Sequence, residues 1–199
     1  MIQTKESLRT IAKAARDGIP PEQQAANALL LRDQFLASLP LPAKATVSAY
    51  MPIQSEISPL PLLEALRARG HKTLMPCTPG HMTTLEFRDW TPGTPMRNTS
   101  AGFPEPADLT TAAYIPDVIL MPVLAFDKEG RRLGYGAGTF DRTLVAWRGK
   151  IPFLTVGIAH QLQFIEAGVP ADALDYTLDL CVTNERVYPF RAGASIWWL

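Results

Sequence analysis

The sequence predicts an α/β domain of three layers, with helices on both faces of a mostly parallel sheet. Short apolar runs alternate with segments of helical periodicity, and this order favours parallel strands joined by right-handed crossovers. One run, Val118–Met121, is apolar throughout, as expected for a strand buried on both faces. With 199 residues, 47% of them hydrophobic, the chain can bury a core, so we expect one domain over residues 1–199. It would have N-terminal helices over residues 1–40 and a C-terminal tail over residues 189–199.

The charges of the chain balance, with 19 lysines and arginines against 19 aspartates and glutamates. Proteins that bind nucleic acids or membrane surfaces usually carry a basic excess, so we expect neither partner. No apolar run approaches the ~18 residues of a membrane span, and no apolar stretch typical of a signal peptide follows the first basic residues. Cys77 and Cys181 lack the spacing of a metal site and are expected as buried free thiols of a cytoplasmic protein.

Two helices are expected at the N-terminus. Thr4 can cap a helix from about Lys5 to Arg16 that ends at Gly18, and a second helix runs from about Glu22 to Ser38. The apolar positions expected to face the core are Leu8, Ile11, Ala12 and Ala15 in the first helix and Ala25, Leu29, Phe35 and Leu36 in the second.

The rest of the chain alternates strands with helices. Strands are expected over Thr46–Tyr50, Lys72–Pro76, Val118–Phe126 through Pro122, Phe153–Gly157 and Leu180–Thr183, with an antiparallel edge strand over Leu85–Trp90. A helix over Pro59–Arg69 would end at Gly70. Another begins at Thr139, with Leu144, Val145 and Trp147 as its apolar positions.

A glycine-rich turn connects the central strand to the helix that begins at Thr139. Gly134, Gly136 and Gly138 alternate there, between two preceding arginines and Asp141. Bare backbone N–H groups and the positive end of a helix both attract anions, so the turn can hold phosphate groups. The spacing of these glycines matches neither the dinucleotide fingerprint nor the P-loop. Elsewhere in the chain, the three histidines are too scattered to indicate a metal cluster.

Other polar residues permit two interpretations each. Lys5 and Arg9 share one face of a helix and could bind an anion or form a solvated basic flank. Glu56 follows a strand, where ligands bind in open α/β sheets, and could instead be an ordinary loop or capping residue. Asp141 could hold a cation beside phosphates or favour the first turn of its helix.

The segment Arg132–Arg142, RLGYGAGTFDR, closely resembles the RLGYGxGYYDR signature of 5-formyltetrahydrofolate cyclo-ligases, also called 5,10-methenyltetrahydrofolate synthetases. Further matches are Lys5–Arg9 with K-x-x-L-R, Glu56 six residues after Tyr50, Gly102–Pro106 with G-I-P-E-P, and Val169–Asp175 with V-P-x-x-x-x-D. The resemblance implies the fold shared by sugar-phosphate isomerases and CoA transferases. Ala137 and Thr139 depart from the signature, because relatives often have glycine or lysine and an aromatic residue there.

The resemblance also implies a reaction. It converts 5-formyltetrahydrofolate and ATP into 5,10-methenyltetrahydrofolate, ADP and phosphate, with magnesium as the metal. The formyl oxygen is phosphorylated, N10 closes the ring and phosphate leaves. The alternative is a non-catalytic relative that binds folate or a nucleotide and has a buffering or regulatory role. The expected partner is a small molecule, and the expected state is a monomer or weak homodimer.

Roles for individual residues follow from the resemblance. Arg132 is the implied catalytic residue, and Asp141 and Asp175 are the implied metal ligands, although Asp175 could also be a turn or capping residue. ATP would be bound by Lys5, Glu6, Ser7, Leu8, Arg9, Arg132, Leu133, Gly134, Tyr135, Gly136, Ala137, Gly138, Thr139 and Phe140. The folate would be bound by Arg9, Met51, Glu56, Phe103 and Tyr135. Phe103 could also serve packing alone, and Asp172 and Asp179 do not fit the family's metal position.

The tail ends in Ile196-Trp197-Trp198-Leu199. Such an apolar end is expected against the body of the protein or at an interface.

Overall fold

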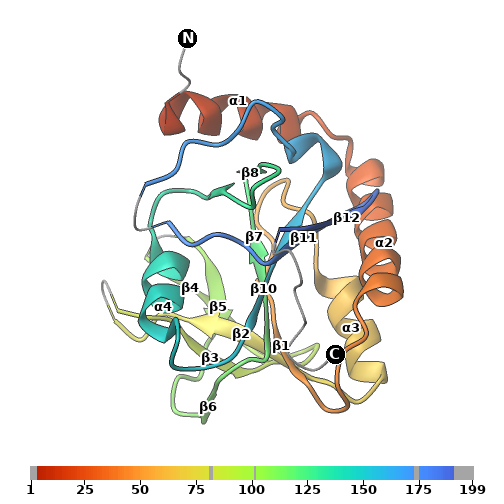
Figure 1. The fold of residues 1–199 in the computed structure, drawn as a ribbon. Helices are drawn as coiled ribbons and strands as arrows, with labels where there is room; N and C mark the ends of the chain where they lie inside the picture. The colour runs from red at the N-terminus through yellow and green to blue at the C-terminus, as the bar shows by residue number, and fades with distance from the viewer. Residues whose placement is uncertain (1–3, 81–82, 101, 173–174, 191–199) are drawn as a thin grey trace.

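One eight-stranded sheet forms the centre of the protein. The computed structural model describes residues 4–80, 83–100, 102–172 and 175–190. The strands of the sheet are β1 (Thr46–Ser48), β2 (Lys72–Cys77), β3 (Glu86–Asp89), β6 (Ala113–Tyr114), β7 (Val118–Pro122), β10 (Leu154–Ala159), β11 (Leu180–Thr183) and β12 (Val187–Pro189). Their spatial order is β12-β11-β10-β7-β1-β2-β3-β6 (Figure 1). The five strands from β11 to β2 pair in parallel, and β12, β3 and β6 add antiparallel pairs. The prediction of a mostly parallel sheet is confirmed.

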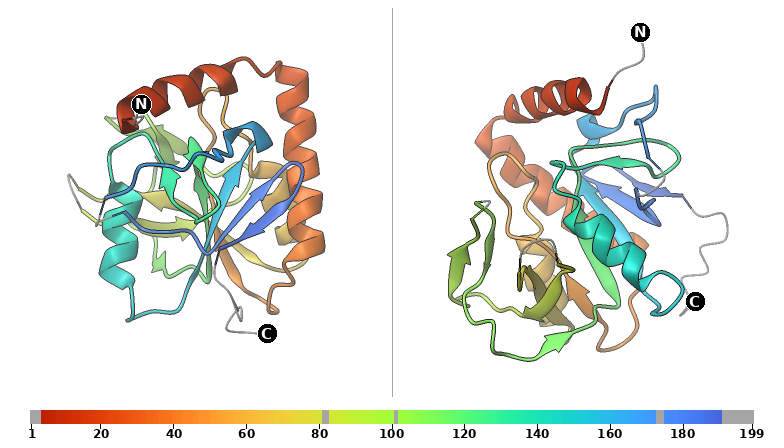
Figure 2. Two further views of the ribbon diagram at one scale, coloured as in Figure 1. Left: turned by 45° about the horizontal axis from the view of Figure 1, so that its top comes forward. Right: turned by 90° about the vertical axis from the view of Figure 1, so that its left-hand side faces the viewer.

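Helices cover both faces of this sheet. They are α1 (Lys5–Asp17), α2 (Pro21–Ser38), α3 (Leu60–Ala68) and α4 (Thr139–Trp147), with a 3-10 turn η1 (Gln161–Gln163). Helices α2 and α3 cover one face and α4 the other, while α1 crosses the edge where the parallel strands end (Figures 1 and 2). The core follows the alternation of β7, because Val118 and Leu120 join the cluster under α2 and α3, whereas Ile119 and Met121 pack with Leu144 of α4.

Local chemistry explains where the helices begin and end. Thr4 caps α1 as predicted, because its side chain accepts a hydrogen bond from the Ser7 backbone N–H. Pro21 stands at the first position of α2, where its missing N–H costs nothing. Gly70 follows α3 with a φ of 87°, a conformation that glycine adopts without strain.

The strands differ from the prediction in several respects. The central strand ends at Pro122, which has no N–H for the ladder, and β8 (Ala125–Phe126) pairs instead with β9 (Arg132–Leu133). β3 pairs with β2 in antiparallel orientation as predicted, but it is not an edge strand, because β6 pairs with its other side. Pro104–Pro106, for which no strand is predicted, forms β5 and pairs with β4 (Met96–Asn98).

The predicted buried face of α1 is wrong by part of a turn. Leu8 and Ala12 are buried, but Ile11 is 53% exposed and Ala15 is also exposed, whereas Arg16 is buried. The helix is rotated because the polar side chain of Arg16 finds partners inside the protein. The spacing of the apolar residues carries no information about these polar contacts, so it does not predict the rotation of the helix.

The faces of α2 and α4 were also partly mispredicted. Phe35 is buried as expected, but Ala25 and Leu29 are exposed, and Ala28 and Leu31 face the core. The run of small and apolar residues in α2 continues around its circumference, so no single face stands out. In α4, Val145 is exposed.

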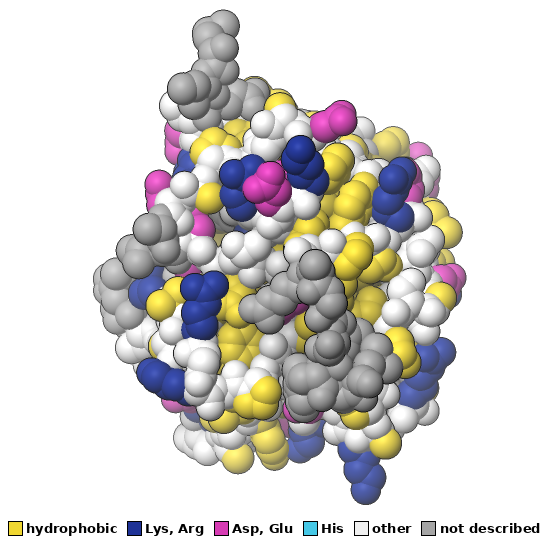
Figure 3. All heavy atoms as spheres, viewed as in Figure 1, with side chains coloured by type: hydrophobic (Ala, Val, Ile, Leu, Met, Phe, Trp, Pro, Cys, Tyr) yellow, Lys and Arg dark blue, Asp and Glu magenta, His cyan; other side chains and the backbone are white. Residues whose placement is uncertain are grey.

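One bulk expectation, the state of the two cysteines, is confirmed within the described residues. Cys77 and Cys181 are buried free thiols, as predicted. No described helix combines the length and the apolar character that crossing a membrane requires. Figure 3 shows basic and acidic side chains interspersed on the face drawn. The apolar end at residues 196–199 lies outside the described residues.

A buried histidine makes stability depend on pH. His160, directly before η1, is 1% exposed, and its Nδ1 lies 3.0 Å from Asn27 Nδ2. Burial lowers the pKa of His160 from 6.5 to about 4. The unfolded chain therefore binds a proton that the folded protein does not, and the stability that this histidine provides above pH 6.5 is lost as the pH falls toward 4.

We expect the free energy of unfolding to fall by about 2 kcal/mol from this histidine alone between about pH 7.5 and about pH 5. Urea unfolding of the parent and of His160→Gln at both pH values measures the difference, because other titrating groups are shared. His71→Gln, at a half-buried histidine elsewhere, is the control. Equal pH dependence of the parent and His160→Gln would contradict the assignment.

Candidate functional site

A cavity of about 430 Å³ lies at the edge where the parallel strands end. Loops that follow β1 and β2, the end of β7, the glycine-rich turn and helix α1 all contribute to its wall. The sheet is the cause of this convergence, since the carboxyl ends of parallel strands meet at one edge.

The structure brings most of the predicted site residues together on this cavity. Those on its wall are Lys5, Arg9, Met51, Glu56, Phe103, every residue from Arg132 to Asp141, and Asp175. Glu6, Ser7 and Leu8 do not line it, so the expected nucleotide segment narrows to Lys5 and Arg9. Helical spacing explains the difference. Lys5 and Arg9 are one turn apart and share the face toward the cavity, whereas Leu8 belongs to a core cluster.

The glycine-rich turn has a conformation that its glycines permit. Gly136 and Gly138 have φ values of 103° and 64°, and Gly138 directly precedes α4. Two arginines hold the turn through its carbonyl oxygens, with Arg9 Nε donating to Gly134 O at 3.0 Å and Arg142 Nη1 to Ala137 O at 2.8 Å. The turn thus has a fixed shape at the N-terminus of a helix, as an anion site requires.

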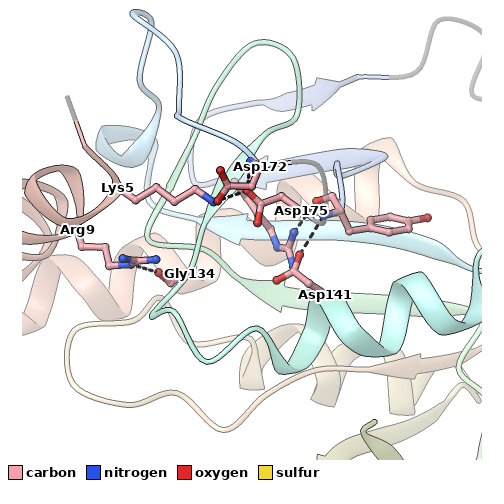
Figure 4. A network of polar contacts seen from close by, with 8 residues as sticks. Lys5, Arg9, Gly134, Asp141, Asp172 and Asp175 are labelled. Atoms are coloured by element: carbon pink, nitrogen blue, oxygen red, sulfur yellow. Dashed lines mark hydrogen bonds and ion pairs between the residues drawn. The ribbon is translucent and has the colours of Figure 1, made fainter. Parts of the chain in front are cut away.

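Arg132 and Asp141 both line the cavity and are joined by hydrogen bonds to each other and to Tyr176; Asp141 is labelled in Figure 4. Arg132 Nη2 donates to Asp141 Oδ1 at 2.8 Å, and the Tyr176 N–H donates to the same oxygen at 3.0 Å. Arg132 Nη1 donates to the Tyr176 carbonyl. Within the described residues both bonds to Asp141 go to Oδ1, which leaves Oδ2 as the oxygen available to a cation.

Lys5 lies between two aspartates (Figure 4). Its Nζ is 2.7 Å from Asp172 Oδ2 and 2.5 Å from Asp175 Oδ2. Burial acts to raise the pKa of Asp175, but the hydrogen bonds from Lys5 and from the Asp172 backbone, with the charge of Lys5, lower it. Burial likewise opposes the charge of Lys5, and its bonds to both aspartates raise its pKa. Lys5 and Asp175 are therefore both charged at neutral pH.

Glu56 lies on the loop after β1 and is 7% exposed. Its Oε2 accepts a hydrogen bond from the Ile53 N–H at 3.0 Å, and Tyr50 Oη fixes the same loop by donating to the Ile57 carbonyl at 2.7 Å. Burial raises the pKa of Glu56, while the bond from Ile53 and the charge of Arg16 oppose that rise. The result is a fixed, partly desolvated carboxylate on the cavity wall, suited to accept hydrogen bonds from a ligand.

Two aromatic rings supply a flat apolar part of the wall. The Phe103 and Tyr135 ring centroids are 6.3 Å apart, with 58° between the ring planes. Both side chains line the cavity and remain about one third exposed. A planar ligand could pack against these rings.

Four residues that matter here were not predicted. Asp172 lines the cavity and binds Lys5, although the family pattern favours Asp175. Glu105 is 3% exposed and its Oε2 accepts the Thr78 N–H at 2.7 Å, so it fixes the loop after β2. The sequence pattern predicts only a strand at Tyr50 and only a helix at Arg16. The position of Arg16, four residues after Ala12 on the apolar face of the helix, is the sequence feature that indicates its burial.

Comparisons with known proteins agree on one family. The model of the 5-formyltetrahydrofolate cyclo-ligase family matches residues 1–184. The chain is 30% identical to 5-formyltetrahydrofolate cyclo-ligase of Haemophilus influenzae, over 88% of this chain and 95% of that protein. The corresponding enzyme of Mycolicibacterium smegmatis is 35% identical over 71% of this chain and 75% of its own. The NMR structure of Aquifex aeolicus 5,10-methenyltetrahydrofolate synthetase, 27% identical, superposes with a TM-score of 0.79 and covers 97% of this chain and 96% of that one.

The conformation of Gly136 gives a test of the turn. An added Cβ would meet Arg9 Nη2 at 3.3 Å and would strain the backbone at a φ of 103°. We expect Gly136→Ala to weaken ATP binding by about tenfold, because the turn must shift away from Arg9, at a stability cost of about 1–2 kcal/mol. Titration calorimetry and thermal unfolding measure the two effects.

Gly93→Ala is the matched control, since Gly93 has a φ of 94°, nothing within 4 Å of an added Cβ, and no place on the cavity wall. It should lose similar stability and keep ATP affinity. If both variants bound ATP like the parent, the turn would not be the phosphate site.

Proposed function

This chain belongs to the 5-formyltetrahydrofolate cyclo-ligase family, and we propose that it converts 5-formyltetrahydrofolate and ATP into 5,10-methenyltetrahydrofolate, ADP and phosphate. One observation carries the proposal beyond family membership. A single cavity brings the phosphate-type turn at Arg132–Asp141 together with the buried Glu56 carboxylate and the Phe103–Tyr135 ring wall. Its volume of about 430 Å³ is in the range of small-molecule sites.

The chemistry calls for positioning and charge neutralisation. The N5 formyl group is an amide, so its carbon is a poor electrophile and its oxygen a poor leaving group. Transfer of the γ-phosphoryl group from ATP to that oxygen converts it into a leaving group. N10 then attacks the carbon within the same molecule, the C–O bond breaks as phosphate leaves, and the N10 proton passes to solvent. The protein must therefore hold the two substrates so that the formyl oxygen meets the γ-phosphate, as in phosphoryl transfer generally.

Each side of the cavity suits one substrate. Backbone N–H groups of residues 134–138 and the N-terminus of α4 would hold phosphates, with Lys5 and Arg9 adding positive charge. Glu56 would accept hydrogen bonds from the amino-pyrimidine edge of the folate, which is an array of donors. Arg132, held by Asp141 and the Tyr176 carbonyl, would stabilise charge on the transferring phosphoryl group.

The charges on the wall explain why a divalent cation would be needed. Glu56, Glu105, Asp141, Asp172 and Asp175 outnumber the three cations that line the cavity, and a negative excess remains after Arg97 offsets Glu105. The donors fit Mg²⁺, which is commonly held by one or two carboxylates together with substrate phosphates. Asp141 Oδ2 would be one ligand. Asp175 would be a second if the phosphates drew Lys5 away from it. When bound, Mg²⁺ would neutralise charge on the phosphate oxygens.

The second candidate function is a non-catalytic relative that binds folate or a nucleotide. It predicts that Asp141 is dispensable, because a binding protein does not need to support phosphoryl transfer. The fixed bond between Arg132 and Asp141 favours the enzyme.

We also propose that the chain forms one domain, since strands from Thr46 to Pro189 share one sheet. The cytoplasmic location and the monomeric or weakly dimeric state stay predictions.

Asp141→Asn tests the enzyme directly. Near-ultraviolet absorbance of the methenyl product should rise only when folate, ATP and magnesium are all present. The variant should lower kcat by at least about 100-fold, because the amide removes a charged metal ligand. Calorimetry should also show that ATP binding no longer depends on magnesium. Asp33→Asn, on the exposed side of α2, is the control and should behave like the parent. Turnover by Asp141→Asn at the parental rate would rule out the metal assignment.

The raised pKa of Glu56 predicts how folate affinity depends on pH. Binding needs the carboxylate, so affinity is full above the pKa of Glu56 and falls as the pH drops through it, at a higher pH than for an ordinary glutamate. Glu56→Gln should weaken folate binding by about tenfold to 100-fold and remove this pH dependence, while ATP affinity stays unchanged. Fluorescence or calorimetric titration of each ligand across pH measures both. A pH-independent affinity in the parent would show that Glu56 does not contact the folate as an anion.

A further inference from the structure

Arg16 is a fully buried cation that the proposed reaction does not use. It lies in the last turn of α1 and is 1% exposed. Lys5, Arg9, Ala12 and Arg16 are spaced by four, three and four residues, so they share one face of the helix. A buried charge is retained only where it is paired or hydrogen-bonded, and the partners of Arg16 therefore indicate its role.

Those partners belong to two loops about 80 residues apart in the sequence. Arg16 Nε donates to Ser55 Oγ at 2.9 Å, directly beside Glu56. Arg16 Nη2 donates to Tyr135 Oη at 2.6 Å, in the glycine-rich turn. Ser55 Oγ donates in turn to Asp17, so two residues of the last turn of α1 hold the neighbour of Glu56.

We infer that Arg16 is a positioning residue, which ties the Glu56 loop to the glycine-rich turn and holds the Tyr135 hydroxyl toward Glu56. The inference rests on the proposed function, which assigns the Glu56 loop to the folate and the glycine-rich turn to ATP. The consequence is that one buried guanidinium sets the distance between the two substrate sites.

The electrostatics of Glu56 support this arrangement. The titratable or charged groups that act on Glu56 are Arg16, Tyr50 and Tyr135. Burial raises the pKa of Glu56, whereas the charge of Arg16 and a hydrogen bond from Tyr135 lower it. Arg16 thus acts on Glu56 directly by its charge and indirectly through the hydroxyl that it binds.

The shape of the side chain explains why arginine is needed. A guanidinium carries donors that point in different directions in one rigid plane, so it can bind Ser55 and Tyr135 at once. A lysine keeps the charge but has one flexible donor group, which cannot reproduce both bonds at the same geometry. Arg16→Lys therefore separates the loss of the link from the loss of the charge.

The experiment compares Arg16→Lys, Tyr135→Phe and the double variant with the parent. Turnover gives kcat and KM for each substrate, and titration gives the folate affinity without ATP. We expect each single variant to raise the folate KM and Kd on the order of tenfold, with a smaller effect on kcat. The double variant should be no worse than the singles, because both remove the same link.

The pH profile distinguishes positioning from a merely structural role. Tyr135→Phe should move the acid limb of folate binding to higher pH, because Glu56 loses a hydrogen bond that favours its charged form. Arg16→Lys should move it less, since the positive charge remains. Tyr188→Phe is the matched control, because it loses a tyrosine hydroxyl that accepts a hydrogen bond from Gln161 outside the cavity wall. It should keep the parental profile.

The outcomes separate the two proposals. A parent that binds folate without turnover would overturn the proposed reaction, and the titrations would still test Arg16. An active parent whose Arg16→Lys and Tyr135→Phe variants keep the folate affinity and pH profile would overturn the inference. The inference would also be overturned if the affinity losses of the two single variants were additive, affected both substrates equally and accompanied a fall in melting temperature.

Discussion

The cavity depends on a row of cations that α1 presents to acceptors on other parts of the chain. Lys5 binds Asp172 and Asp175, Arg9 binds the Gly134 carbonyl, and Arg16 binds Ser55 and Tyr135. These contacts place the helix across the carboxyl ends of the strands, where only one of its sides meets the protein (Figure 1). These contacts also determine the rotation of the helix about its own axis, because charged hydrogen bonds are roughly twice as strong as neutral ones.

Under the proposed function, the same contacts make α1 part of both substrate sites. Its first half reaches the glycine-rich turn and the aspartates after Val169, and its last turn reaches the loop that carries Glu56. Phosphate groups entering beside Lys5 would compete with Asp172 and Asp175 for its ammonium group. A cation that binds the freed carboxylates would compensate for that loss. Binding of ATP and of the metal are therefore expected to support each other through the position of Lys5.

The sequence allowed the sheet and the turn to be predicted because their causes are local. The apolar run Val118–Met121 and the glycines before Thr139 define a strand and a turn without reference to the rest of the chain. The faces of α1 and α2 could not be predicted in this way. Arg16 is buried by partners at positions 55 and 135, and Asn27 by His160, and such pairings appear only when the chain is folded. Asp172 was missed for the same reason, since a family pattern favoured Asp175 while Lys5 binds both.

The two departures from the family signature are accommodated by Arg142. Its Nη1 binds the carbonyl of Ala137, and its Nη2 is 3.3 Å from Thr139 Oγ1, so a threonine in place of an aromatic residue becomes an acceptor within the turn. Ala137 cannot offer the charge that a lysine would bring to a phosphate, but its carbonyl is held by Arg142. The missing ring is also less costly than the signature suggests, because Phe103 and Tyr135 already form an aromatic wall. Tyr135, which the signature shares, then has two tasks: its ring packs beside Phe103, and its hydroxyl accepts a hydrogen bond from Arg16.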